Sequence, residues 1–360
     1  MHVLRYAGCL LTNNHTTGHI DPATVAWNQT DMVAAFIECP DVFPLGSTGK
    51  HVAIASLYNW HAGGYYTNEW FLGTIANSTR FVLEDRGLLD YGQYYAARTG
   101  SATQDPLGRR VLFSATGWHN PQGMDGSCKG QYHLIPRDMG LDAQGRVTFS
   151  PIPELASLHQ PGTRVVHELP AAAPRGGSDG GKAVTAAAVL APQPRAMRTN
   201  ASGSMLELQL NCTGAPTSPG AHGDVVGIQL LASDDLTQYT TVGFNYTSQR
   251  LFVSQKRSSA AGLLGGRGGL MQTAPLRGGL GPDGLQLFVL LDYALIEAFA
   301  NRRAVLSSWV GQIMWKDTPA PADRKVFALP PPEGVTCRFQ AWGLTPLLPP
   351  NPLPPPTSPE

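Results

Sequence analysis

The chain has 360 residues, enough for two domains of ordinary size, and 42% of them are hydrophobic, so it can bury a core of its own. Charged residues make up 14% against a usual value of about 25%, and 26 basic residues balance 26 acidic ones. This balance argues against a basic groove for phosphate, and we expect no nucleic-acid partner. The 40 glycines and 30 prolines favour short strands and turns over long helices.

No apolar run reaches the roughly 18 residues of a membrane span, and we expect no membrane partner. Residues 1–11 lack an apolar segment with a cleavage site, so we expect no signal peptide within this chain. Acceptor sequons of the N-x-Ser/Thr type nevertheless occur at Asn14, Asn28, Asn77, Asn200, Asn211 and Asn245. These sequons predict a secreted glycoprotein whose export signal is not in this chain.

The five cysteines are scattered without a C-x-x-C pair, which excludes a zinc knuckle or a thioredoxin-type motif. At most two disulfides can form among them. Cys128 and His133 are a single pair without the further ligands of a zinc site. We therefore expect neither a metal nor a cofactor.

The first half of the chain predicts short strands, because β-branched and aromatic segments alternate with Asn, Gly, Asp and Pro clusters. The expected strands are Lys50–Tyr58, Glu69–Ile75, Thr79–Leu83, Tyr94–Thr99, Arg110–Thr116, Tyr132–Ile135 and Arg146–Phe149. Residues 151–158 predict a short helix with Pro near its start.

The second half predicts a β-sandwich after a loose insertion near residues 170–204. Its expected strands are Met205–Leu210, Val225–Leu231, Tyr239–Asn245, Arg250–Gln255, Leu285–Leu291, Ile296–Ala300 and Ala304–Val310. Residues 260–284 are expected to form a long glycine-rich connection. Residues 346–360 form a proline-rich segment that we expect to be a disordered tail.

The segment with most chemical content runs from Phe36 to Leu45 and contains Glu38-Cys39-Pro40-Asp41. An acid within an apolar stretch is expected to be desolvated, which favours the protonated form that a general acid needs. The alternative interpretation is an acid at a strand end that caps a turn.

These residues resemble the E-C-P-D signature of glycoside hydrolase family 32, the invertases and other β-fructofuranosidases. The similarity continues in the same order along the chain: Gly73-Thr74, then Leu89–Ala97 with Asp90, then Arg109–Phe113 with Gly117-Trp118, then Ile135-Pro136-Arg137, then Leu291–Phe299. The matches extend over roughly residues 30–310.

The resemblance implies an all-β fold, a partial five-bladed β-propeller followed by a β-sandwich. Residues 1–155 would supply about three blades and residues 156–345 the sandwich. It also implies hydrolysis, with retention, of terminal fructosyl bonds in sucrose or fructans, in a secreted, cell-wall or vacuolar protein. Glu38 would be the general acid/base.

The resemblance further implies that Asp90, Trp118, Asp41 and Cys39 contact the substrate. The structural alternatives are a turn residue for Asp90 and core packing for Trp118. The residues at the positions that influence substrate choice in acid invertases are Tyr66 and Asn68, so the preferred fructoside stays open.

The chain departs from the family in two motifs that carry catalytic carboxylates. W-x-N-D-P-N-G, which holds the nucleophile, and R-D-P, which holds the transition-state stabiliser, are both absent. Asp21-Pro22 and Arg137-Asp138 resemble these motifs only superficially. We therefore expect an N-terminally truncated member that is inactive or nearly so by itself, because no covalent intermediate can form.

Two explanations of this departure stay open: a fragment of an active enzyme, or a natural truncation. The latter would be a non-catalytic protein that binds carbohydrates or acts at a surface. H-E-x-x-H, G-x-S-x-G and Walker motifs are absent from the sequence, so other common enzyme classes fit less well.

Overall fold

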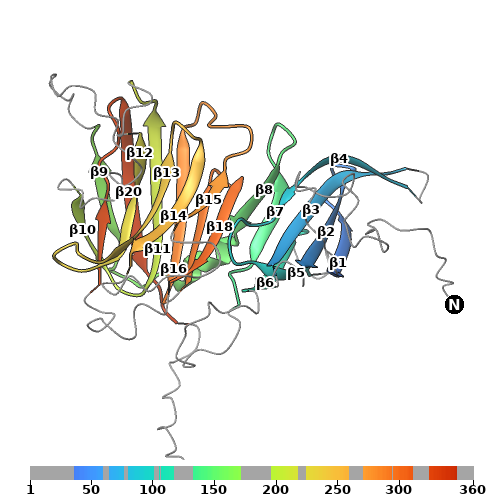
Figure 1. The fold of residues 1–360 in the computed structure, drawn as a ribbon, viewed down its shortest axis with the longest axis horizontal. Coiled ribbons are helices and arrows are strands. Elements are labelled where there is room, and N and C mark those ends of the chain that lie inside the picture. The colour runs from blue at the N-terminus through green and yellow to red at the C-terminus, as the bar shows by residue number, and fades with distance from the viewer. Residues whose placement is uncertain are drawn as a thin grey trace, which may run out of the picture.

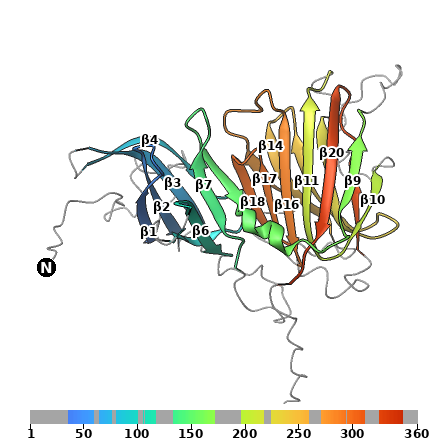
Figure 2. The same ribbon diagram turned by 180° about the vertical axis from the view of Figure 1, so that it is seen from behind.

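The protein is described here by a computed structural model that covers residues 36–59, 65–76, 80–100, 105, 107–116, 133–171, 196–217, 224–258, 271–293, 295–310 and 324–346. Figure 1 shows two small sheets beside a larger pair of sheets, and Figure 2 shows the same arrangement from behind. The described part is all-β apart from one 3-10 helix, as the sequence predicts. No helix in these ranges is long and apolar enough to cross a membrane.

Each of the two small sheets has four antiparallel strands that follow one another in the chain, as in a propeller blade. The first comprises β1 (Phe36–Pro44), β2 (His51–Asn59), β3 (Tyr65–Ala76) and β4 (Arg80–Leu88). The second comprises β5 (Tyr95–Thr99), β6 (Arg110–Ala115), β7 (Arg137–Leu141) and β8 (Val147–Pro151). The described residues thus contain two blades, and the third blade expected within residues 1–155 lies outside them.

The two larger sheets form the sandwich, each with six antiparallel strands. One sheet has the order β18 (Ala304–Trp309), β17 (Leu295–Ala300), β16 (Leu285–Asp292), β11 (Met205–Gly214), β20 (Val335–Gly343) and β9 (Val165–Leu169). The other has the order β10 (Met197–Ser202), β19 (Lys325–Ala328), β12 (Val225–Ala232), β13 (Tyr239–Asn245), β14 (Arg250–Arg257) and β15 (Met271–Pro275).

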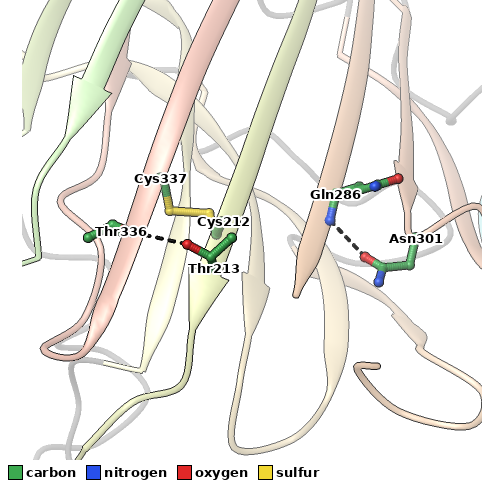
Figure 3. The surroundings of a disulfide bond; sticks show 6 residues. All are labelled: Cys212, Thr213, Gln286, Asn301, Thr336 and Cys337. Carbon is green, nitrogen blue, oxygen red and sulfur yellow. Dashed lines mark hydrogen bonds between the residues drawn. A yellow bond between two sulfur atoms is a disulfide. The ribbon is translucent and has the colours of Figure 1, made fainter. Parts of the chain in front are cut away.

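The 3-10 helix η1 (Pro153–Leu158) connects the second blade to the sandwich, where a short helix is predicted. Cys212 and Cys337 form a disulfide between directly paired residues of β11 and β20 (Figure 3). Cys39 is a free thiol. The remaining cysteines, Cys9 and Cys128, lie outside the described residues.

Several strand predictions need correction. The expected strand Tyr132–Ile135 is described from His133 onward, and there His133 forms an isolated bridge to Ala115, while the strand itself is β7, which follows. The strands β10 and β15 lie within segments expected to be loops. Both strands are short and carry polar residues, so their own periodicity is weak, and pairing with β19 and β14 places them in the sheet.

The strands β17 and β18 explain how the two halves join, because every residue of both is buried. Ile296, Ala298 and Leu306 pack into the core of the sandwich. Phe299 and Val305, on the opposite face, pack into the core that both blades share. These two strands, buried on both faces, therefore make the blades and the sandwich one packed body.

Candidate active site

Glu38 and Tyr95 occupy corresponding positions on the first strands of the two blades, β1 and β5. Each is followed by a residue with positive φ, Cys39 at 47° and Ala96 at 55°. The strand register shifts at both places, between Glu38 and Asp41 and just after Tyr95. A β-bulge bends its strand and redirects a side chain, and bulges are common beside active sites. The two bulges therefore mark the place where the blades present side chains to one another.

The carboxylate of Glu38 accepts a hydrogen bond from the hydroxyl of Tyr95. Tyr95 is itself buried, and its carbonyl accepts a hydrogen bond from the Ser114 hydroxyl at 2.8 Å. Glu38 is exposed, so the expectation that its apolar neighbours desolvate it is wrong. The bulge releases Glu38 from the alternation of the strand. The buried Tyr95 side chain thus orients the Glu38 carboxylate, which stays accessible to solvent.

Sequence reasoning missed Tyr95 as a site residue, although it stands within the run Leu89–Ala97 that carries the family resemblance. The signal is a structural one, because Glu38 and Tyr95 each begin a bulge in consecutive blades. A comparison of the two blades as repeats would have placed the two residues side by side.

Asp41 and Cys39 complete the bulge of β1. The carboxylate of Asp41 accepts hydrogen bonds from the backbone N–H of Thr99, at 3.0 Å, and from its hydroxyl, at 2.7 Å. Asp41 thereby ties the first blade to the second, and this geometry gives it a structural role. Cys39 is half-buried and reduced. The substrate contacts expected of both residues stay predictions.

A row of polar side chains crosses the first blade behind Glu38. Glu38 pairs with Ser56 and Ser56 with Asn68 in the strand register. The Ser56 hydroxyl donates to Asn68 Oδ1 at 2.8 Å, and Asn68 Nδ2 donates to the carbonyl of Tyr94. Asn68, expected at a position that influences substrate choice, therefore links the blades from a buried location.

Asp90 lies in the interior, where its carboxylate accepts four hydrogen bonds. Oδ1 accepts from the N–H groups of Gly92, at 2.6 Å, and Ser307, at 2.9 Å. Oδ2 accepts from the Ser307 hydroxyl at 2.8 Å and from Arg137 Nη1 at 2.9 Å. The side chain has no exposed surface. The geometry gives Asp90 a structural role, and its sugar contact stays a prediction.

Arg137 joins Asp90 of the blades to Glu297 of the sandwich. Its Nη2 donates to Glu297 Oε2 at 2.7 Å and to the Ser307 hydroxyl at 2.7 Å, and its side chain is fully buried. Burial acts to lower the pKa of Arg137, but the two carboxylates outweigh it and raise the pKa above its ordinary value. Burial also raises the pKa of Glu297, which Arg137 opposes. We refer to Asp90, Arg137, Glu297 and Ser307 as the interdomain network.

The interdomain network extends to the candidate site through Tyr94. The guanidinium of Arg137 lies 4.2 Å from the centroid of the Tyr94 ring. Burial raises the pKa of Tyr94 to about 12. Tyr94 precedes Tyr95 in the chain, so the network fixes the start of β5, the strand whose Tyr95 donates a hydrogen bond to Glu38.

Trp118 lies outside the described residues, as does the side chain of Tyr66. Within the described part, no group of three or more His, Cys, Asp or Glu residues could hold a metal ion.

Two family models match the chain. Residues 17–151 match the glycosyl hydrolases family 32 N-terminal domain, and residues 177–311 match the glycosyl hydrolases family 32 C-terminal domain. No curated protein matches the sequence.

Solved structures with the same fold include an exo-inulinase from Aspergillus awamori, at 17% identity and a TM-score of 0.61, which covers 86% of this chain and 57% of its own. Fructan 1-exohydrolase IIa from Cichorium intybus is similar at 16% identity and a TM-score of 0.61, over 87% of this chain and 62% of its own. A sucrose-6-phosphate hydrolase from Lactobacillus gasseri matches at 17% identity and a TM-score of 0.57. The match covers 86% of this chain and 55% of the hydrolase. This chain therefore spans about 55–62% of the length of these three proteins.

Proposed function

This chain belongs to glycosyl hydrolase family 32, and from that membership we propose that it is a glycoside hydrolase of the β-fructofuranosidase type with Glu38 as its general acid/base. The observation that carries the proposal is the exposed Glu38 carboxylate on a bulge, held by the Tyr95 hydroxyl of the neighbouring blade. Glu38 would protonate the leaving oxygen of a terminal fructosyl bond and then deprotonate the attacking water.

Sucrose and fructan oligosaccharides are the proposed substrates. One solved relative, the Cichorium intybus fructan 1-exohydrolase, is described in complex with 1-kestose, which supports an oligosaccharide of this class. A retaining mechanism also needs a carboxylate nucleophile about 5 to 5.5 Å from the acid/base. Because the 360 residues contain neither W-x-N-D-P-N-G nor R-D-P, we propose that this polypeptide alone hydrolyses sucrose little or not at all.

We also propose that the chain matures in the secretory pathway. The disulfide Cys212–Cys337 supports this, because such bonds form and persist in oxidising compartments. The six sequons agree with it.

Turnover by the 360-residue chain is the first test. We expect no release of fructose from sucrose or inulin-type oligosaccharides above the rate without protein. Hydrolysis that persists in the wild type and stops in Glu38→Ala would overturn the proposal of inactivity while it supports the role of Glu38. Binding of these sugars without turnover would instead favour the non-catalytic carbohydrate-binding alternative.

The role of Glu38 is tested in a fusion that carries the two absent motifs, taken from a family member, before this chain. Glu38→Ala should lower sucrose hydrolysis by at least about 10²-fold, as expected for loss of a general acid. A fructoside with a good leaving group needs no proton at departure, so its first step should be much less impaired. Added azide, which needs no deprotonation, should restore turnover through an azide adduct.

Glu84→Ala is the matched control in the same fusion. Glu84 is an exposed carboxylate of the first blade that pairs with Lys50 at 2.5 Å. Glu84→Ala should leave the rates of hydrolysis of both substrates unchanged. If Glu38→Ala impairs both substrates equally, without azide rescue, Glu38 has no acid/base role.

A further inference from the structure

A groove of about 480 Å³ opens at one end of the sandwich, away from Glu38. It lies where four segments meet: the connection from η1 to β9, the turn from β10 to β11, the turn from β16 to β17, and the end of β20. Hydrogen bonds join these segments, including Leu344 N–H to the Met205 carbonyl at 3.1 Å and Tyr293 N–H to the Ser204 carbonyl at 2.7 Å. Its volume falls within the roughly 300–1,000 Å³ of ligand pockets. The groove is thus a defined site at the end of paired strands.

The lining of the groove is polar but nearly uncharged. It contains hydroxyl and amide side chains, among them Thr163, Ser204 and Asn200, and no Asp or Glu occurs among its described lining residues. Tyr293 is 43% exposed, and its φ of 48° places it at the tip of its turn. An exposed aromatic ring beside hydroxyl and amide groups suits a saccharide, which offers apolar C–H faces and hydroxyls to hydrogen-bond.

One wall of the groove is held rigidly. The ring of His159 stacks on Trp342 with 4.7 Å between centroids, and the Arg164 guanidinium lies 5.7 Å from the Trp342 ring. His159 also contacts the carboxylate of Glu207 at 2.9 Å. Since Trp342 and Arg164 both line the groove, this wall keeps its shape without a ligand.

Asn200, which borders the groove, is the acceptor residue of the sequon Asn200-Ala201-Ser202. Asn200 is exposed, whereas its neighbours Thr199 and Ala201 are buried. Its φ of 62° marks an irregular position in β10, which Asn tolerates well. A glycan attached to Asn200 would therefore begin at the edge of the groove.

The two other sequons in the described part do not border the groove. Asn211 is exposed on β11, beside the buried disulfide residue Cys212. Asn245 is half-buried, and its Oδ1 accepts a hydrogen bond from the Ser248 N–H at 2.8 Å. Asn200 thus differs from both by its position, and Asn211 provides an internal control.

We propose that the groove is a saccharide-binding site whose ligand is the first residues of an N-linked glycan on Asn200 of the same chain. The glycan would pack a sugar face on Tyr293 and place hydroxyls against the polar lining. Its effect is to brace the end of the sandwich where the four segments meet. The proposal does not depend on the activity of Glu38.

The test uses the full chain secreted from a eukaryotic host, with glycopeptide mass spectrometry and thermal unfolding. We expect a glycan on Asn200. Ser202→Ala removes the sequon without changing Asn200, and it should lower Tm by about 2–4 °C. Tyr293→Ala should lower Tm by a similar amount in the glycosylated chain and have little effect in Ser202→Ala. Asn211→Gln should leave the effect of Tyr293→Ala unchanged.

A second measurement separates the sources of the sugar. The Ser202→Ala chain, whose groove carries no attached glycan, is titrated with chitobiose, sucrose and 1-kestose while protein fluorescence is followed. We expect chitobiose to bind at millimolar concentration and Tyr293→Ala to abolish this binding. Tyr293-dependent binding of sucrose or 1-kestose without chitobiose would overturn the glycan assignment. An unmodified Asn200, or equal effects of Tyr293→Ala with and without the glycan, would overturn it as well.

Discussion

The carboxylates of the interdomain network and the carboxylate of Glu38 differ in their exposure to solvent and in their hydrogen-bond partners. Asp90 and Glu297 are fully buried, and each is paired with Arg137 and with further N–H or hydroxyl donors. Glu38 is exposed, and the Tyr95 hydroxyl donates a hydrogen bond to its carboxylate. Buried charges need a complete set of partners, whereas a carboxylate that exchanges protons with a substrate must stay accessible. One region stabilises the joint between blades and sandwich, and the other keeps a reactive group open.

Loss of Arg137 should give the largest effect. Arg137→Met leaves Asp90 and Glu297 buried without a counter-ion, which should destabilise the protein by about 3–5 kcal/mol. Urea unfolding followed by fluorescence measures it. Arg98→Met, at an exposed position of β5, is the control and should change stability by about 0.5 kcal/mol or less. A loss of under about 1 kcal/mol for Arg137→Met would contradict the assigned role.

Removal of the disulfide should have the second-largest effect on stability. Cys212 and Cys337 are separated by 125 positions in the sequence. Loss of such a cross-link should lower the free energy of unfolding by about 2–5 kcal/mol. The double variant Cys212→Ser/Cys337→Ser should show this by urea unfolding, with the blade region affected less than the sandwich in hydrogen exchange. Cys39→Ser, a free thiol, is the control. Equal exchange in both regions would contradict the expected localisation.

The contact between Tyr95 and Glu38 should contribute less to stability. Tyr95→Phe and Glu38→Ala should each destabilise by about 0.5–1.5 kcal/mol, because one hydrogen bond is lost. In a double-mutant cycle the second substitution should add little to the first. Fully additive losses would show that the two side chains do not interact in solution.

The smallest effect concerns a partly exposed ion pair between the second blade and η1. Hydrogen bonds from Arg109 lower the pKa of Asp105 and of Glu154, with Arg109 Nη2 lying 2.6 Å from Glu154 Oε1. Lowered carboxylate pKa values contribute stability above their ordinary values, about 4, that is lost as the pH falls. The Tm difference between wild type and Arg109→Gln should therefore be small at pH 7 and shrink as the pH falls below about 4. A difference that grows on acidification would contradict this.

The sequence alone determined the all-β class, most strand positions and the family. Segments such as Lys50–Tyr58 and Leu285–Leu291 are short, mostly apolar runs that follow a glycine and end before Asn59 and Asp292, which predicts strands, and β2 and β16 lie there. Glu38-Cys39-Pro40-Asp41 identified the candidate acid from a local motif. Such features depend on residues close together in the chain.

The tertiary structure decided what each polar residue contacts. Asp90 and Ser307 are 217 positions apart in sequence, and Arg137 and Glu297 are 160 apart, so no local pattern could pair them. The exposure of Glu38 likewise depends on a bulge, and its partner Tyr95 lies 57 positions away. Periodicity reports which face of a strand is apolar, but only the packing of β17 and β18 between two cores brings these distant charges together.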